Sequence, residues 1–177
     1  GYQWDIGSKN YQDRMYINNG KGTFQQGSGI VPEDFENGGT VISMDINGDQ
    51  QMDLFIGGGA SPGRYPFADQ SKIFINRKGQ LIDETKEWFK TVSNSFGIVK
   101  DAISMDINKD GKNDLIICGE WMPITILIND GKQLIDNTAD YGLDHSQGWW
   151  QSISAGDLDG DGDLDLVIGN LGLNSKF

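Results

Sequence analysis

Residues 157–166 read DLDGDGDLDL, a run in which aspartate occupies every second position. Residues 45–54 (DINGDQQMDL) and 106–115 (DINKDGKNDL) have the same form, D-x-[DN]-x-D-x-x-x-D-L, with first aspartates 61 and then 51 residues apart. Three copies at such spacing indicate a repeat architecture.

A second element alternates with the first. Residues 75–85 (INRKGQLIDET) match residues 128–138 (INDGKQLIDNT), and a looser copy, INNGKGTF, lies at residues 17–24. The first repeat is longer mainly within Gly57–Lys72, which contains Pro62, Gly63 and Pro66. Because proline and glycine are typical of turns, this difference indicates an insertion in one loop of an otherwise constant repeat.

Each repeat reads as four short strands, a to d. Strand a ends at the acidic loop and strand b leaves it, and a glycine-containing turn joins strands c and d. The predicted ranges are Val41–Met44 (a), Leu54–Ile56, Leu115–Cys118 and Leu166–Ile168 (b), Lys72–Asn76 and Ile124–Asn129 (c), and Gln80–Asp83 and Gln133–Asp136 (d). Antiparallel strands repeated in this way favour an all-β fold, a β-propeller segment of four-stranded blades. A parallel β-helix is the alternative, and the hairpin-type turns argue against it.

The copies give about three blade equivalents. We expect a single segment over residues 1–177, divided into a half blade with strands c and d (11–38), two blades (39–90 and 96–141) and a half blade with strands a and b (149–177). A propeller closes with roughly four to eight blades. The chain is therefore expected to be cut from a longer protein, or else to self-associate through its open blade edges.

Composition excludes several classes of function. A net charge of −12 disfavours nucleic-acid binding, because phosphate groups require a basic surface. No apolar run is long enough to insert into a membrane, and the first residues lack the pattern of a signal peptide. Cys118 is the only cysteine and lies in an apolar strand, so we expect a buried thiol. His145 is the only histidine, and its polar surroundings predict an exposed loop.

The acidic loops have the pattern of a calcium site. Side-chain oxygens at positions 1, 3, 5 and 9, with a backbone carbonyl at position 7, form the oxygen cage that Ca²⁺ prefers. Up to three ions are expected, and the predicted ligands are Asp45, Asn47, Asp49, Gln51 (carbonyl) and Asp53; Asp106, Asn108, Asp110, Lys112 (carbonyl) and Asp114; and Asp157, Asp159, Asp161, Asp163 (carbonyl) and Asp165.

Two other interpretations fit these loops less well. An EF-hand requires glutamate at position 12 and flanking helices, whereas position 12 here is Ile56, Ile117 or Ile168 in a predicted strand. Simple Asp/Asn-Gly turns would explain one copy better than three copies in register. Position 6 has to turn sharply and is Gly111 and Gly162 in two loops but Gln50 in the first. We expect the Asp157 loop to bind most tightly, then the Asp106 loop, then the Asp45 loop.

These residues resemble the FG-GAP/VCBS repeat family, which includes integrin α-subunit propellers and many bacterial surface proteins. Phe96-Gly97 before a predicted strand a and Gly57–Pro62 after a strand b resemble the two halves of the family name. Gly59–Pro66, Gly119–Ile124 and Gly169–Asn174 are closer to long bacterial VCBS-repeat proteins of the ASPIC/UnbV type. The resemblance covers about residues 11–177 and implies a seven-bladed calcium propeller in an exported protein.

We therefore expect a calcium-stabilised binding or scaffold module, secreted or at the cell surface, with adhesion or ligand recognition as its role and no catalysis of its own. The ligand, protein or glycan, is not identified. The alternative is a part of a polysaccharide-binding or polysaccharide-degrading propeller, with Gly57–Lys72 and Gly119–Thr125 lining its binding face. Of the adjacent Trp149 and Trp150, one is expected in the core and one exposed, and Glu120-Trp121 is open to packing or binding.

Overall fold

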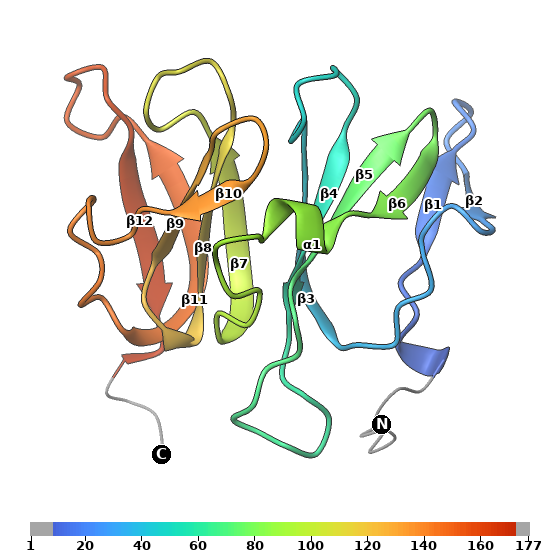
Figure 1. Ribbon diagram of the computed structural model, residues 1–177, viewed down its shortest axis with the longest axis horizontal. Helices are drawn as coiled ribbons and strands as arrows, with labels where there is room; N and C mark the ends of the chain where they lie inside the picture. The colour runs from blue at the N-terminus through green and yellow to red at the C-terminus, as the bar shows by residue number, and fades with distance from the viewer. Residues whose placement is uncertain (1–8, 173–177) are drawn as a thin grey trace.

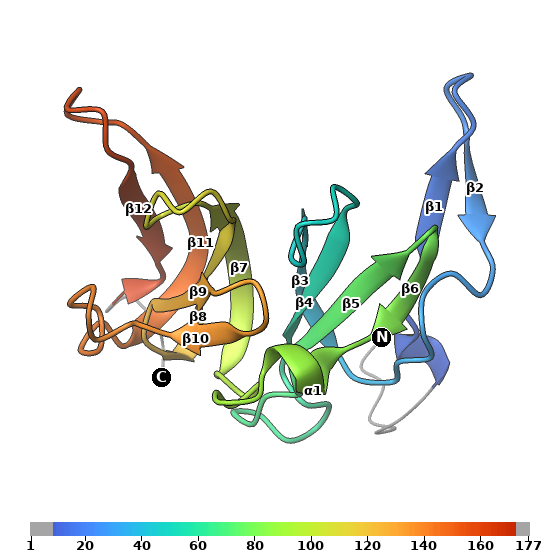
Figure 2. The same ribbon diagram turned by 45° about the horizontal axis from the view of Figure 1, so that its top comes forward.

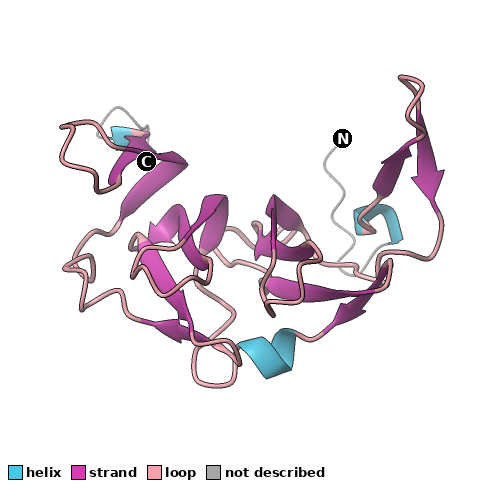
Figure 3. Ribbon diagram, turned by 90° about the horizontal axis from the view of Figure 1, so that it is seen from above, coloured by secondary structure: helices cyan, strands magenta, loops and turns pink. Residues whose placement is uncertain are grey.

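The computed structural model describes residues 9–172. Its strands form antiparallel sheets that follow one another along an arc (Figures 1 and 3). A 3₁₀ turn (Lys9–Tyr11) precedes a two-stranded hairpin, the N-terminal half blade, of β1 (Met15–Asn18) and β2 (Phe24–Gly27). The expected residues 1–8 and 173–177 of the segment lie outside the described residues.

Two four-stranded blades form the centre of the molecule, each with its strands paired in chain order. The first blade is a sheet of its own, whereas the second belongs to a six-stranded sheet that includes the final hairpin. Blade one consists of β3 (Gly38–Met44), β4 (Asp53–Gly58), β5 (Lys72–Arg77) and β6 (Gln80–Asp83), followed by the short helix α1 (Thr85–Trp88). Blade two consists of β7 (Ile98–Met105), β8 (Asp114–Met122), β9 (Thr125–Asn129) and β10 (Leu134–Asp136).

A final hairpin of β11 (Gly148–Gly156) and β12 (Asp165–Asn170) forms the C-terminal half blade. The start of β11 also pairs with the end of β8, where Trp149 lies opposite Glu120. The blades spread as a fan in Figure 2. The expectation of an all-β chain with four-stranded antiparallel blades is confirmed, and the arrangement is that of a partial β-propeller.

Strand β8 is apolar on both faces because other parts of the molecule pack on both sides of it. In β8, Leu115 and Ile117 belong to the core between blades one and two, whereas Ile116 and Cys118 belong to the core against the C-terminal half blade. Side chains along a strand point alternately to opposite faces, which explains this division. Cys118 is fully buried, as predicted, and burial raises the pKa of its thiol to about 11.

Glycine allows blades one and two to approach closely at strands β3 and β7. A Cβ on Gly39 would lie 2.4 Å from the carbonyl oxygen of Val99, and one on Gly57 would lie 2.6 Å from its side chain. Neither position has room for a larger residue. The first strands of neighbouring blades therefore pack backbone against backbone.

The second repeated element closes each blade through a threonine. The Thr85 hydroxyl accepts the Ile73 N–H at 3.0 Å in blade one, and the Thr138 hydroxyl accepts the Ile126 N–H at 3.1 Å in blade two. An aspartate two residues earlier, Asp83 in blade one, accepts the threonine N–H. Because an unpaired buried N–H is costly, this threonine hydroxyl stabilises the start of strand c.

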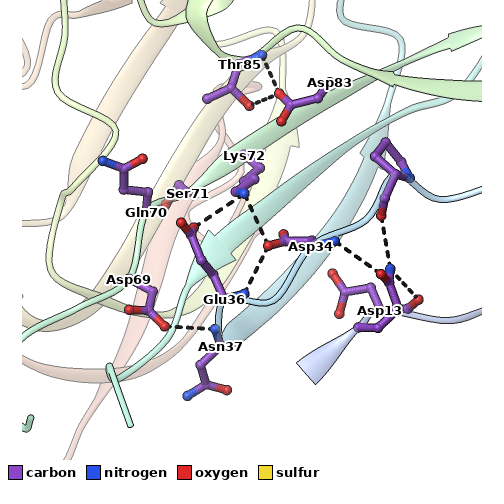
Figure 4. A network of polar contacts seen from close by, with 12 residues as sticks. Asp13, Asp34, Glu36, Asn37, Asp69, Gln70, Ser71, Lys72, Asp83 and Thr85 are labelled. Atoms are coloured by element: carbon purple, nitrogen blue, oxygen red, sulfur yellow. Dashed lines mark hydrogen bonds and ion pairs between the residues drawn. The ribbon is translucent and has the colours of Figure 1, made fainter. Parts of the chain in front are cut away.

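A half-buried ion pair fixes the segment before β3 to blade one (Figure 4). Lys72 Nζ lies 3.1 Å from Asp34 Oδ1 and 3.5 Å from Glu36 Oε2, and Asp34 is only 5% exposed. Burial alone would lower the pKa of Lys72, but its hydrogen bond with Asp34 and the nearby carboxylates outweigh this and raise it. Lys72 therefore stays charged and paired.

The burial of two adjacent tryptophans differs from the expectation. Trp149 and Trp150 are both half-buried, so the expected division into one core and one exposed side chain is wrong. The reason is that the start of β11 packs between β8 and the loop that precedes β11, where the Trp150 indole donates to the Ser146 carbonyl.

No helix within residues 9–172 has the length and apolar character to cross a membrane.

Candidate metal-binding loops

The three acidic loops share one position and one internal geometry. They join β3 to β4, β7 to β8 and β11 to β12 at the same end of the sheets, the top of Figure 1. The first aspartate of each loop accepts a backbone N–H from position 6. These are Asp45 from Gln50 (2.8 Å), Asp106 from Gly111 (2.8 Å) and Asp157 from Gly162 (3.1 Å).

Positions 3 and 5 form successive side-chain turns. Each accepts the N–H two residues further on, a local pattern that Asp and Asn favour. The position-3 acceptors are Asn47, Asn108 and Asp159, and the position-5 acceptors are Asp49, Asp110 and Asp161, which bind the N–H groups of Gln51, Lys112 and Asp163. The carbonyl oxygens of these last three residues remain predicted ligands.

The ninth aspartate has a different role, because it joins the loop to the next strand. Asp53 is fully buried and accepts the Ile46 N–H at 2.9 Å on one oxygen and the Asn76 N–H at 2.7 Å on the other. Asp114, also fully buried, repeats this with Ile107 at 3.0 Å and Asn129 at 2.8 Å. In the third loop Asp165 accepts the Leu158 N–H at 3.0 Å.

Burial raises the pKa of both Asp53 and Asp114 above the ordinary aspartate value. The two backbone N–H groups on each carboxylate lower the pKa, and neighbouring loop aspartates raise it again. The ninth position therefore carries negative charge that is only partly compensated by the protein. A cation within the loop would compensate it further.

The third loop brings carboxylates together most closely. Oxygens of Asp157, Asp159 and Asp165 lie within 4.8 Å of one another, and no other such group of acidic, His or Cys side chains occurs in the described part of the chain. Asp161 falls outside this group. The donor set is all oxygen and fits a hard cation such as Ca²⁺.

In the first and second loops, the predicted ligands make contacts within their own loop. Asn47 Nδ2 donates to Asp49 Oδ2 at 3.1 Å, and Lys112 Nζ lies 2.7 Å from Asp110 Oδ2. The hydrogen bond from Lys112 lowers the pKa of Asp110. An ammonium group thus lies on one predicted ligand of the second loop. A hollow of about 330 Å³ separates the two loops and is lined by both.

Backbone strain is distributed differently from the expectation. The left-handed turn at position 6 is present, with φ of 67° at Gln50, but position 4 is left-handed as well. That position is Gly48 in the first loop and Gly160 in the third, whereas in the second it is Lys109, with φ of 60°. The first and second loops therefore each strain one non-glycine residue. Strain at Gln50 is therefore not a reason to expect a lower calcium affinity for the Asp45 loop than for the Asp106 loop.

Two asparagines that the sequence analysis did not assign to the site stabilise the loops. Asn129 Nδ2 donates to the Ile46 carbonyl of the neighbouring blade at 2.8 Å, and Asn76 Nδ2 donates to the Met52 carbonyl at 3.2 Å. In the sequence, each of these asparagines belongs to the Ile-Asn pair that opens the second repeated element, and this repetition could have identified them. Lys109 also contacts Asp163 of the third loop at 2.6 Å, so the loops of neighbouring blades interact.

A comparison with protein-family models finds one match, to the FG-GAP-like repeat, over residues 6–56 and 106–168. The two regions cover more than half of the chain and include the three acidic loops. The first runs from before β1 into β4, and the second from the Asp106 loop into β12. No curated protein matches the chain.

The strained turns give a test. Gln50→Gly and Lys109→Gly should each raise the free energy of unfolding by about 1 kcal/mol, because a non-glycine residue in the left-handed region costs about 1–2 kcal/mol. Gln51→Gly, next to Gln50 but without positive φ, is the matched control and should lower stability by about 0.5–1 kcal/mol. Urea unfolding measures all three. Equal losses in the three variants would contradict the assignment of strain.

Proposed function

Because the chain belongs to the FG-GAP-like repeat family, we propose that it is a calcium-stabilised propeller segment that serves as a binding or scaffold module for ligand recognition. The observation that carries the calcium proposal is the shared loop geometry, with the converging oxygens of Asp157, Asp159 and Asp165 as its clearest case. In that site the carboxylates of the third loop hold the ion. The ion supplies positive charge between strands β11 and β12.

The role of the ions in this proposal is structural. Each loop joins the first two strands of a blade, and its ninth aspartate accepts a backbone N–H from strand c in blades one and two. An ion bound to the folded loop favours the folded state by mass action, which amounts to about 2.7 kcal/mol when the ion concentration is one hundred times Kd. The sites are expected to fill at the millimolar calcium of extracellular fluid, which supports an exported protein.

We propose binding without catalysis, and the surroundings of the single histidine and the single cysteine support this. His145 is the single histidine of the sequence, and its side chain is 93% exposed beside Asp144. The single cysteine is buried with a raised pKa, which disfavours the thiolate. Adhesion is the proposed use of such a module, because FG-GAP-like repeats occur in extracellular proteins.

The calcium proposal predicts a selective gain of stability. Adding 1 mM Ca²⁺ to protein freed of metal by chelation should raise the Tm, and Mg²⁺ at the same concentration should do so much less, since Mg²⁺ loses its water reluctantly. Asp157→Asn should remove the highest-affinity step in calorimetry. Asp144→Asn, an exposed aspartate outside the loops, is the control and should leave the titration unchanged. A Tm unaffected by Ca²⁺, or raised equally by Mg²⁺, would contradict the proposal.

We also propose that a second copy of this chain completes the half blades. Within residues 9–172, β12 pairs only with β11 and β1 only with β2. In both full blades strand b pairs with strand c in one register, in which Leu54 lies opposite Phe74 and Leu115 opposite Leu127. By the repeat alignment, Leu166 of β12 would lie opposite Tyr16 of β1 in a second copy.

The same alignment supplies a hydrogen bond across this interface. Asn18 holds the position of Asn76 and Asn129, so its N–H would reach Asp165 as theirs reach Asp53 and Asp114. Apolar side chains are exposed on both hairpins, among them Tyr16 (55%), Phe24 (64%) and Val167 (54%). Two copies joined at both edges contain six blade equivalents, within the range of closed propellers.

Sedimentation over a concentration series tests this association. The chain should form a dimer between about 1 and 100 μM, and Val167→Lys should weaken it at least tenfold, because a charge on an edge strand opposes pairing. Val41→Lys places the same charge on β3, at a site of similar exposure (55%) that lies on neither hairpin of the proposed interface, and should leave the dimer intact. A chain that is monomeric at 100 μM, or equal effects of the two variants, would refute it.

A further inference from the structure

Three aromatic rings, from blade one, blade two and the C-terminal half blade, meet at the end opposite the acidic loops. Tyr65 comes from the long connector between β4 and β5, which lies at the bottom of Figure 1, Trp121 from the end of β8 and Trp149 from the start of β11. The Trp121 ring lies 5.4 Å from that of Trp149 and 6.5 Å from that of Tyr65, edge to face in both pairs. The rings therefore form one cluster across the blades.

A chain of hydrogen bonds runs through the cluster in one direction. The Trp121 indole N–H donates to Tyr65 Oη at 3.1 Å, and the Tyr65 hydroxyl donates to Glu120 Oε2 at 3.2 Å. The other Glu120 oxygen lies 2.9 Å from Lys100 Nζ. The donors of Trp121 and Tyr65 are thus used inside the cluster. Lone pairs of the tyrosine oxygen and of the carboxylate can still accept hydrogen bonds from a ligand.

Trp121 is held out of the core by a strained backbone. Its φ is 64°, within a strand, although bulky residues rarely adopt the left-handed region. Burial does not compensate for this strain, because the side chain is 55% exposed. Strained residues of this kind occur at ligand sites, where the surrounding structure holds them in place. Tyr65 is similarly exposed, at 54%.

The connector that carries Tyr65 is well ordered by its own contacts. The Ser61 N–H donates to the Phe67 carbonyl at 2.8 Å, and the Phe67 N–H donates to the Arg64 carbonyl at 2.9 Å. The Arg64 guanidinium lies over the Phe67 ring, 5.4 Å from its centre. Tyr65 is therefore presented on a closed loop, which limits the entropy that a ligand would have to overcome.

We propose that this cluster binds a neutral hexopyranose, as a monosaccharide unit of a glycan, through Trp121, Tyr65 and Glu120. The C–H face of the sugar packs on an exposed ring, and its hydroxyls donate to the lone pairs of Glu120 and Tyr65. The inference rests on the proposed function, because it names the ligand class of that binding module. The net charge of −12 disfavours acidic sugars.

The same pattern disfavours a proline-rich peptide. Aromatic grooves that bind such peptides use donor groups of their Trp and Tyr side chains on the carbonyls of the peptide, which are acceptors. Here the donors of Trp121 and Tyr65 are occupied, whereas the oxygens of Tyr65 and Glu120 can accept hydrogen bonds. A ligand rich in hydroxyl donors fits the cluster better than one rich in carbonyls.

Indole N–H signals of ¹⁵N-labelled protein in 5 mM Ca²⁺ provide the test. The probes are methyl β-glucoside, methyl α-mannoside and methyl β-galactoside, with glucuronate and a hexaproline peptide as controls. At least one methyl glycoside at millimolar concentration should shift the Trp121 and Trp149 signals saturably. Trp121→Gly should weaken binding at least tenfold without lowering the Tm, because glycine accepts the positive φ; a mere packing role predicts a lower Tm.

Two more variants secure the result. Tyr65→Phe keeps the ring but breaks the hydrogen-bond chain, and should weaken binding several-fold in folded protein. Tyr141→Ala removes a partly exposed ring elsewhere (38%) and should change nothing. The proposal is overturned if no methyl glycoside at 50 mM shifts these signals, if Trp121→Gly or Tyr65→Phe binds undiminished, or if hexaproline is the probe that saturates. A Tm that rises with Ca²⁺ beside absent sugar binding would leave the calcium proposal standing.

Discussion

The buried carboxylate at the ninth position of each complete blade is the interaction on which the sheet depends. Asp53 and Asp114 each join the acidic loop to strand c through two backbone N–H groups. Leaving such groups unpaired in the interior costs about 1–3 kcal/mol each, and a buried carboxylate without partners costs more. One side chain thus fixes both the loop between the first two strands and the third strand of the blade.

The repeated architecture separates two ends of the molecule. At one end, short turns packed with aspartate oxygens bring strands a and b together and suit a cation. At the other end, exposed aromatic side chains lie together, with Tyr65 on the long connector between β4 and β5 and Trp121 at the end of β8. The buried strands between them hold both ends in place, since β8 packs on blade one with one face and on the C-terminal half blade with the other.

Local patterns in the sequence were sufficient to predict the strands, the turn at Gln50 and the buried Cys118, because periodicity and turn chemistry act over a few residues. The left-handed backbone of Lys109 was not predicted, since glycine stands at that position in the other two loops and lysine gives no signal for a turn. The contact from Asn129 to the Ile46 carbonyl was also missed, because it joins residues 83 positions apart. Trp149 and Trp150 were misassigned for a similar reason, as the pairing of β11 with β8 is a tertiary contact.

Unfolding of Asp114→Asn and Asp106→Asn by urea in calcium-free buffer tests the role of the ninth position most directly. The amide introduced by Asp114→Asn has one acceptor oxygen where two buried N–H groups require partners. We therefore expect this variant to lose about 1–3 kcal/mol more than the variant at the half-buried Asp106. Equal losses in the two variants in calcium-free buffer would contradict the account. A loss at Asp114 that occurs only after Ca²⁺ is added would also contradict it, because it would assign this carboxylate to the metal alone.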